Sequence, residues 1–329
     1  MSSEKQKKSL KSKILRIIFW IIGIILFIII GYIIITLICN SIDNKKLKEL
    51  DKKYSKKIEV NGHQMSFNIV GEMNNKTIVI LPGLASPSPI IEFKPLTENL
   101  SDKYKIVIPE PFGYGYSDIV GTNRTIENII NELHECTMKL GIEEYYLMGH
   151  SLGGLYSLKW ANTFPNEVKG FVGLDSSVSG IERNQGSEPE GLITVYESYK
   201  RYFKLGLGRI YYLFKPLSLD QTYTNYTDDE LKAFRILSTI KAYNDDIMSD
   251  VYQFQENIKK LNGVKFPDSV PVLNILSSEN VELIPIWNEL HYEVLGNNTL
   301  NEVIILEGPH YIHFKQREAI AKKIKEWLK

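Results

Sequence analysis

The stretch from Met148 to Gly154 reads MGHSLGG and places Ser151 between glycines at both second-neighbour positions. The apolar run 145–148 before it predicts a strand, and the segment 152–163 after it predicts a helix. Where a strand turns so sharply into a helix, the serine hydroxyl is exposed at the edge of the sheet, near the free N–H groups of the helix. The pattern therefore predicts that Ser151 is a nucleophile, although glycines that only tighten a turn would give the same letters.

A serine hydroxyl needs a base to become a good nucleophile, and the chain has six histidines. His310 lies in the loop that follows the predicted strand 302–306. Loops at the carboxyl ends of parallel strands meet at one edge of a sheet, where Ser151 is also expected. His310 is therefore the predicted base, and His313 is the second choice. The other histidines are predicted to be structural or surface residues: His63, His134, His150 and His291.

Negative charge that develops on a substrate carbonyl oxygen is stabilised by two fixed N–H donors. The backbone N–H of Leu152, directly after Ser151, is the first candidate donor. The second is the N–H of Leu84, in the loop that leaves the predicted strand 77–81. A nucleophile, a base and two such donors together indicate acyl transfer.

Four segments of the chain occur in the order and at the spacing of a known family: LPGLASPSP, PEPFGYGYSD, MGHSLGG and EGPHYIHF. Through them the chain from residue 57 to residue 329 resembles the α/β-hydrolase superfamily. The resemblance implies a mostly parallel eight-stranded sheet with helices on both faces, and a helical insert that forms a cap over the active site. The site residues that it implies are the nucleophile Ser151, the base His310 and the oxyanion donors Leu84 and Leu152.

The acid of the triad is where the chain departs from the family pattern. Many relatives carry an aspartate after the seventh strand, and Asn280 stands at that position here. Some relatives place the acid after the sixth strand, where Asp175 follows the apolar run 170–174 in this chain. Asp175 is therefore the predicted acid. Glu279 is the alternative acid, and Glu282, or no acid at all, is the remaining alternative.

Apolar strands that alternate with helical segments predict a parallel sheet covered on both faces. The segments 57–60 and 65–70, joined by an Asn-Gly pair, predict a hairpin at its start. An aromatic helical stretch interrupts the alternation, so the predicted domains are a core (57–178 and 265–329) and a cap (179–264). The other predicted strands are 77–81, 105–108, 145–148, 170–174, 271–276 and 302–306, and the predicted helices are 125–140, 152–163, 285–294 and 316–328.

Residues 17–42 contain no charged side chain. About 20 apolar residues in a helix span a bilayer, and this run exceeds that length. A secretory signal has a shorter apolar region of about 7–15 residues that ends in small residues, unlike this run. The run therefore predicts an uncleaved single-pass membrane anchor, with a cationic tail before it (1–16) and a linker after it (43–56). Lysines lie on both sides of the span, but the short tail favours a cytoplasmic amino terminus and an extracellular catalytic domain.

The composition excludes some classes of partner. Lysine plus arginine and aspartate plus glutamate each number 39, so no overall field attracts nucleic acid. Cys39 lies in the apolar run and Cys136 in a predicted helix, so neither a disulfide nor a metal site is expected. No organic cofactor is expected either. The lipid bilayer is the expected partner of residues 17–42.

Together these residues predict a membrane-anchored serine hydrolase. Ser151, His310 and Asp175 would cleave a carboxylic ester, or an amide or thioester, through an acyl-enzyme. The aromatic insert favours a small-molecule substrate with an apolar portion. The alternative is a catalytically inactive binding or interaction protein with the same fold at the membrane, because fold does not fix function.

Overall fold

The computed structural model describes residues 2–183, 189–217, 219 and 226–328. The chain divides into two compact units, Met1–Glu49 and Leu50–Lys329. Parts of the predicted cap, residues 184–188, 218 and 220–225, therefore lie outside the described residues.

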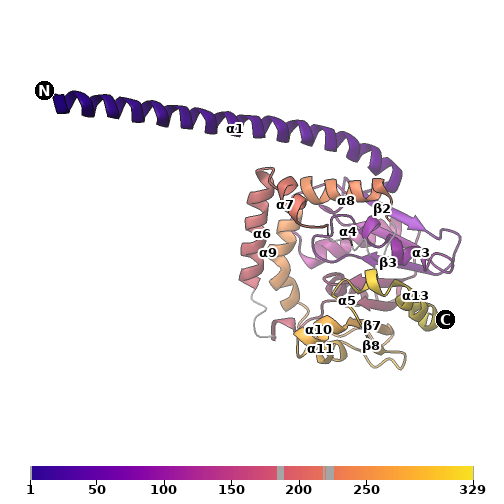
Figure 1. The fold of residues 1–329 in the computed structure, drawn as a ribbon. Coiled ribbons are helices and arrows are strands. Elements are labelled where there is room, and N and C mark those ends of the chain that lie inside the picture. Colours follow the sequence, from indigo (N-terminus) through magenta and orange to yellow (C-terminus); the bar gives the residue numbers. More distant parts are fainter. Residues whose placement is uncertain (1, 184–188, 218, 220–225, 329) are drawn as a thin grey trace. The chain divides into compact units, whose positions relative to one another are not determined.

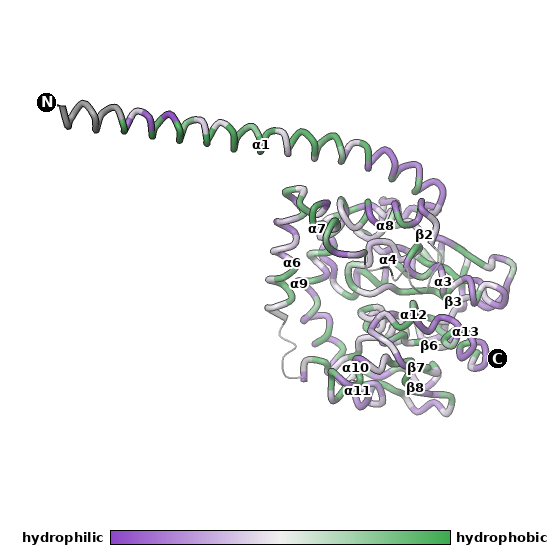
Figure 2. The backbone as a smooth tube through the Cα atoms, viewed as in Figure 1, coloured by the Kyte–Doolittle hydropathy of each residue, from purple (hydrophilic) through white to green (hydrophobic). Residues whose placement is uncertain are grey.

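The first unit is formed by one long helix, α1 (Ser2–Tyr54), whose last residues belong to the second unit. Large apolar side chains along its middle are exposed, and Figure 2 shows this apolar section with a polar stretch before it and another after it. At about 1.5 Å per residue, residues 17–42 extend for about 39 Å, more than the roughly 30 Å of a bilayer's hydrocarbon core. In length and composition α1 fits an amino-terminal membrane anchor.

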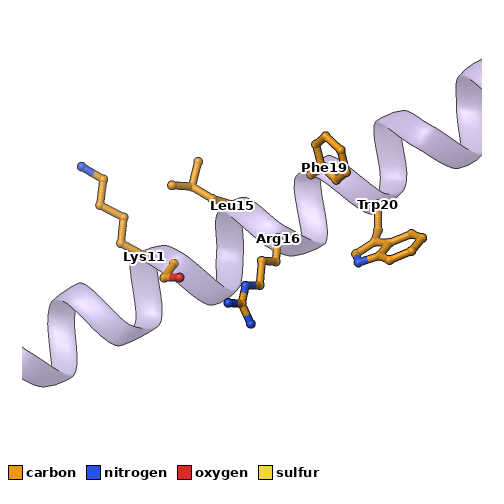
Figure 3. Close-up of a pocket in the computed structure, with 6 residues that line it drawn as sticks. Lys11, Leu15, Arg16, Phe19 and Trp20 are labelled. Carbon is orange, nitrogen blue, oxygen red and sulfur yellow. The ribbon is translucent and has the colours of Figure 1, made fainter.

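Figure 3 shows the start of this apolar run. Lys11 and Arg16 project from the same stretch of helix as Leu15, Phe19 and Trp20. Basic side chains that give way to aromatic ones are typical of the place where a membrane-spanning helix meets water. The sequence of side chains therefore fits a membrane boundary close to Arg16.

The predicted linker, residues 43–56, is mostly helical. Helix α1 continues to Tyr54, and strand β1 begins at Lys56. Six of the fourteen residues of the segment are Lys, and it contains neither Gly nor Pro, so no strong helix breaker interrupts it. Leu50 is buried in the second unit, which places the boundary between the units inside the helix.

The second unit contains an eight-stranded sheet with the order β1-β2-β4-β3-β5-β6-β7-β8. β1 and β2 form an antiparallel hairpin, β2 pairs antiparallel with β4, and the remaining neighbours are parallel. This is the mostly parallel eight-stranded sheet that the sequence predicted. The strands are β1 (Lys56–Val60), β2 (His63–Val70), β3 (Thr77–Leu81), β4 (Lys105–Glu110), β5 (Tyr145–His150), β6 (Val168–Leu174), β7 (Val272–Ser277) and β8 (Glu302–Leu306).

Helices cover both faces of this sheet. Those along the core are α2 (Pro89–Glu92), α3 (Lys94–Glu98), α4 (Ile126–Lys139), α5 (Gly153–Thr163), α10 (Ser278–Leu283), α11 (Trp287–Glu293), α12 (Ile312–Lys315) and α13 (Arg317–Trp327). Those between β6 and β7 are α6 (Pro189–Lys204), α7 (Gly208–Phe214), α8 (Asp228–Ile240) and α9 (Asp245–Lys259), after a short 3-10 turn, Ile181–Arg183.

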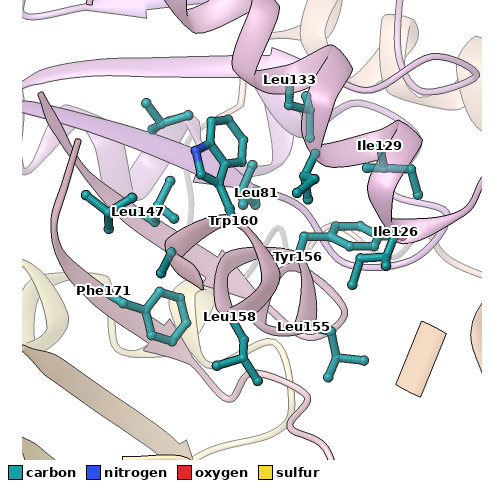
Figure 4. Packing of buried hydrophobic residues seen from close by; sticks show 14 of the residues in the cluster. Leu81, Ile126, Ile129, Leu133, Leu147, Leu155, Tyr156, Leu158, Trp160 and Phe171 are labelled. Atoms are coloured by element: carbon teal, nitrogen blue, oxygen red, sulfur yellow. The ribbon is translucent and has the colours of Figure 1, made fainter. Parts of the chain in front are cut away.

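Alternate residues of the central strands enter two separate hydrophobic cores, because successive side chains of a strand point to opposite faces. In β3, Val79 and Leu81 pack with side chains of α4 and α5. Ile78 and Ile80 face the other side and pack with side chains of α3 and α13. Figure 4 shows the first core, in which Trp160 of α5 is fully buried. The two cores fix the sheet between helical layers.

The helices α6 to α9 form the insert that the sequence predicted between β6 and β7. Helix α6 packs beside α9, as Figure 1 shows. Aromatic rings fill the insert: Tyr199 stacks on Tyr243 with ring centroids 5.4 Å apart, and Phe203 lies 4.9 Å from Tyr243. The aromatic composition of this stretch is therefore used for packing within the insert.

Sequence patterns did not identify the shortest helices. Helices α2, α3, α10 and α12 have four to six residues each, which is too short for a helical period to emerge. Two of them matter for the site, because α10 follows β7 and α12 begins just after His310.

Candidate active site

Ser151 lies in the turn between β5, which ends at His150, and α5, which begins at Gly153. Its φ is +50°, in the left-handed region that an L-residue enters only under strain, and such strain is concentrated at functional sites. A Cβ on Gly149 would lie 2.6 Å from the carbonyl oxygen of Gly153. The turn is therefore too tight for a larger residue at Gly149.

The loop after β3 lies against this turn. A Cβ on Gly83 would lie 3.0 Å from Cβ of Ser151, so the backbone next to Leu84 comes close to the serine. Among the described residues, neither the N–H of Leu84 nor that of Leu152 donates a hydrogen bond to a protein acceptor. Both predicted oxyanion donors are therefore left available on the two elements that meet at Ser151.

Asp175 and His310 are brought together at the same edge of the sheet. Asp175 follows β6 with φ +44°, and His310 follows β8. His310 Nδ1 lies 2.7 Å from Asp175 Oδ2. Because an ionised carboxylate only accepts hydrogen bonds, Nδ1 carries the proton and donates it, which leaves Nε2 as the free acceptor of a neutral imidazole. His310 is thus set up to take a proton through Nε2.

The carboxylate of Asp175 is fully buried and accepts hydrogen bonds from five donors of the described residues. Oδ1 accepts from the N–H of Ser277 and from Nε1 of Trp287, at 3.0 and 2.9 Å. Oδ2 accepts from Oγ of Ser277 at 2.8 Å, from Asn280 Nδ2 at 2.6 Å and from His310. Burial, the largest single influence, raises the pKa of Asp175, but the hydrogen bonds of His310, Ser277 and Trp287 outweigh it and leave this pKa below its usual value.

The two residues after β7 that were weighed for the acid have different positions. Asn280, at the family's usual acid position, donates to Asp175 and lies 3.1 Å from His310 Nδ1. Among the described residues, Glu279 makes no hydrogen bond to the imidazole of His310. Its Oε2 instead accepts a hydrogen bond from the backbone N–H of His310 at 2.8 Å. Glu282, the remaining candidate, is exposed on α10. Of the carboxylates considered, Asp175 is therefore the one bonded to the ring.

Ser277 and Trp287 are site residues that the sequence did not reveal. Both contact Asp175 from more than a hundred residues away in the chain, and no motif marks them. Asn280 carried a signal, because it stands where an aspartate is usual. An amide there can donate to Asp175, whereas a second carboxylate would repel it.

Three buried titratable side chains lie next to His310: Glu92, His150 and His313. His150 Nε2 donates to the backbone carbonyl of His310 at 3.2 Å. His313 stacks on Phe93 with ring centroids 4.8 Å apart, and its Nε2 lies 3.5 Å from Oε1 of Glu92. Burial raises the pKa of Glu92 and lowers the pKa of both histidines, that of His313 to about 3. The second-choice base, His313, is therefore a neutral residue behind the site.

The remaining histidines have structural contacts. His291 is buried and bonds the backbone carbonyls of Trp287 and Ser176, and His134 bonds Glu167. His63, at the start of β2, is exposed. Within the described ranges, no three His, Cys, Asp or Glu side chains are grouped as metal ligands would be.

Comparison with known proteins identifies relatives over most of the second unit. A family model for the alpha/beta hydrolase fold matches residues 76–228. The Bacillus subtilis protein YbdG, described as uncharacterized, is 25% identical over 288 residues, which cover 83% of this chain and 85% of YbdG. RutD of Yersinia enterocolitica, named as a candidate carbamate hydrolase, is 27% identical over 115 residues, 34% of this chain and 41% of RutD.

Solved structures match a similar share of the chain. The epoxide hydrolase VrEH1 from Vigna radiata has a TM-score of 0.60 and 18% identity, and the match covers 83% of this chain and 97% of that one. The epoxide hydrolase CorEH has a TM-score of 0.64 and 16% identity, with 83% and 98% covered. At these identities the likeness concerns the fold alone, and it confirms the fold that the four sequence segments predicted.

The buried histidines lead to a prediction about stability and pH. An unfolded chain protonates histidine below about pH 6.5, whereas His313 in the native state stays neutral until about pH 3. The unfolded state therefore binds the extra proton, and the contribution of His313 to the free energy of unfolding falls as the pH falls from 6.5 towards 3. Glu92, whose pKa is raised, contributes in the opposite sense, so the test is the difference between variant and wild type. One proton bound only by the unfolded state gives a slope of at most about 1.4 kcal/mol per pH unit. We expect His313→Gln to make the wild-type slope shallower by close to this amount.

Urea unfolding of the full-length chain in detergent, repeated between pH 7.5 and 4.5, measures this slope. His63→Gln, which changes an exposed histidine, is the matched control and should keep the wild-type slope. Parallel curves for His313→Gln and the wild type would show that His313 is protonated in the native state.

Proposed function

We propose that this chain, which has the α/β-hydrolase fold, is a serine hydrolase that cleaves a carboxylic ester, or an amide or thioester, through an acyl-enzyme. The observation that carries the proposal is the 2.7 Å hydrogen bond between the imidazole of His310 and the buried carboxylate of Asp175, at the sheet edge where Ser151 occupies a strained turn. Each of these groups has the chemical character that its role requires.

In the proposed reaction, Oγ of Ser151 attacks the substrate carbonyl carbon while Nε2 of His310 takes the hydroxyl proton. The carbonyl oxygen gains negative charge, which the N–H groups of Leu84 and Leu152 would stabilise. His310 then gives its proton to the leaving alcohol, amine or thiol, and the acyl group remains on Ser151. A water molecule, activated by the same imidazole, releases the carboxylic acid and restores the serine.

Asp175 has two tasks in this cycle. Its hydrogen bond to Nδ1 keeps the proton on that nitrogen, so that Nε2 is free to act as the base. Its lowered pKa keeps it ionised at neutral pH, so its charge stabilises the imidazolium that forms during attack. The further bonds from Ser277, Asn280 and Trp287 hold the carboxylate in one orientation.

A small cavity next to the proposed site indicates the substrate class. It has a volume of about 60 Å³ and is lined by the loop after β3, through Ala85 and Pro87, and by Tyr212, Leu237 and Tyr243 of the insert. Mostly apolar walls favour a small apolar group on one side of the scissile bond. The position of the insert residues in this lining supports their assignment to a cap.

The absence of an aspartate at position 280 is the sequence feature that would favour the alternative, a non-catalytic binding protein. Asp175 supplies His310 with a carboxylate from a different strand end, so that argument loses its basis. A carbamate, the substrate class in the name of RutD, presents a carbonyl group to which the same acyl-transfer steps apply.

The proposal predicts the behaviour of the nucleophile. Ser151→Ala should abolish ester turnover and labelling by a fluorophosphonate probe, because it removes the oxygen that attacks the carbonyl in the proposed mechanism. Its thermal midpoint should stay equal or rise. Ser176→Ala is the matched control, since Ser176 is buried near the turn and its Oγ has no partner among the described residues. Turnover by Ser151→Ala within tenfold of the wild type would remove Ser151 from the mechanism.

A second prediction separates the two acids. Asp175→Asn keeps the size of the side chain but removes the charge, so we expect kcat to fall by about 10³–10⁴-fold. Glu279→Gln keeps an acceptor for the N–H of His310 and should cost less than tenfold. Steady-state kinetics on one p-nitrophenyl ester measures both. The reverse order would move the acid to the end of β7.

We also propose that α1 anchors the chain in a membrane with the hydrolase domain outside the cell. Met73 is 95% exposed in the second unit, so a cysteine there is open to a membrane-impermeant maleimide. We expect Met73→Cys to be labelled on intact protoplasts, and Ser3→Cys, in the cationic tail, to be labelled only after lysis. The parent chain, with Cys39 and the buried Cys136, gives the background. The opposite pattern would place the domain in the cytoplasm.

A further inference from the structure

Ala85, which follows the proposed oxyanion donor Leu84, has an unusual conformation. Its φ is +58°, in the left-handed region that favours glycine and is strained for alanine. Its N–H donates to the phenolic oxygen of Tyr114 at 3.2 Å. A residue held in a strained conformation relaxes unless its surroundings fix it. The contact with Tyr114 is one anchor of this loop, and the hydrogen bond from Oγ of Ser86 to Glu92, at 2.6 Å, is another.

Tyr114 is itself held by the helical insert. Its hydroxyl donates to Oδ2 of Asp250, in α9, at 2.7 Å, and both side chains are buried. A hydroxyl that donates to a carboxylate becomes a better acceptor, because the two hydrogen bonds polarise each other. The bond from Ala85 to Tyr114 therefore gains strength from Asp250.

A buried charge network supports Asp250. Arg124 is fully buried, with Nε 3.6 Å from Oδ1 of Asp250 and Nη1 2.6 Å from Oε2 of Glu132. Burial raises the pKa of Asp250 to about 7, and Arg124 opposes this rise. Buried ion pairs are seldom more stable than apolar side chains of the same volume. Stability is therefore a weak reason for this network, and a role in orienting Tyr114 is a stronger one.

The loop that carries Tyr114 is fixed to the insert at further points. Asn244 Nδ2 donates to the carbonyl of Gly113 at 2.7 Å. Asp246 accepts the N–H groups of Val120 and Gly121 at 2.8 and 2.7 Å. These bonds on either side of Tyr114 leave its ring little freedom to follow a moving loop, so Tyr114 can transmit a fixed position from α9 to Ala85.

We propose that Tyr114, oriented by Asp250, is a positioning residue that fixes the peptide between Leu84 and Ala85. The preceding peptide, which carries the N–H of Leu84, is joined to it at Cα of Leu84, so this anchor limits the directions in which that N–H can point towards the substrate oxygen. This inference rests on the proposed serine hydrolase function. It gives the insert a part in the chemical step besides covering the substrate. Tyr114 touches neither the substrate nor the reacting atoms; it acts through Leu84.

Tyr114→Phe tests the proposal, because it removes one hydroxyl and keeps the ring. Removing an oxyanion donor outright costs about 10²–10³-fold in kcat, so a misdirected donor should cost about 10–100-fold. We expect this loss in kcat on p-nitrophenyl acetate, with KM within threefold. A trifluoromethyl ketone, whose adduct with Ser151 carries the same oxyanion, should bind weaker by the same factor.

Tyr116→Phe is the matched control. Tyr116 lies two residues away in the same loop, it is buried, and its hydroxyl has no partner among the described residues. This variant should stay within threefold of the wild type in kcat and inhibitor affinity. Asp250→Asn, which keeps an acceptor for Tyr114, should lose less activity than Asp250→Ala. Equal effects of Tyr114→Phe and Tyr116→Phe on kcat would overturn the proposal.

Hydrogen exchange of the full-length chain tests the contact without any substrate. The peptide that contains Ala85 should exchange faster in Tyr114→Phe and at the wild-type rate in Tyr116→Phe. Unchanged exchange in Tyr114→Phe would overturn the proposal even if esters prove not to be substrates. Faster exchange together with an unlabelled Ser151 would instead support the contact and refute the hydrolase function.

Discussion

A buried carboxylate, that of Asp175, is the constraint on which the edge of the sheet depends. An ionised group so far from water is stable only if hydrogen bonds replace its hydration. The donors come from the end of β7, from α10, from α11 and from the loop after β8. These elements must therefore all be folded before the charge is tolerated, so the site is assembled as one unit with the last third of the sheet.

Much of this architecture follows from local sequence. Continuous apolar runs located β3 and β8 at their observed bounds, and helical periodicity located α4 and α13 to within one residue at each end. These elements are long or uniform enough for pattern and burial to agree. The shorter helices α10 and α12 depend on tertiary contacts, so no local sequence pattern predicts them. The end of α1 was missed for the opposite reason, because a lysine-rich segment looks like a linker and is also a good helix former.

A candidate site could be predicted from the sequence where a few adjacent residues form a motif. MGHSLGG indicated Ser151 and Leu152, and the loop after the last strand indicated His310. The acid was harder to choose, because two of the donors to the Asp175 carboxylate, Ser277 and Trp287, lie more than a hundred positions from it in the chain. A lone sequence shows an aspartate after a strand, but it does not show whether that aspartate has donors. The Tyr114 contact with Ala85 joins two loops that no motif connects.

The position of Asn280 suggests a route by which the acidic residue of such a site could move, during evolution, from the end of one strand to the end of the next. The Asn280 amide touches both Asp175 Oδ2 and the imidazole of His310, so the family's usual acid position and Asp175 converge on nearly the same point in space. An ancestor with aspartate at both positions would have held two like charges against one imidazole, and one of them would have been protonated at neutral pH. Replacing either aspartate by its amide relieves that conflict without moving the histidine. A site with the acid after the sixth strand and a site with the acid after the seventh strand are therefore each one substitution away from the same intermediate. That intermediate, with both aspartates, is less stable than either.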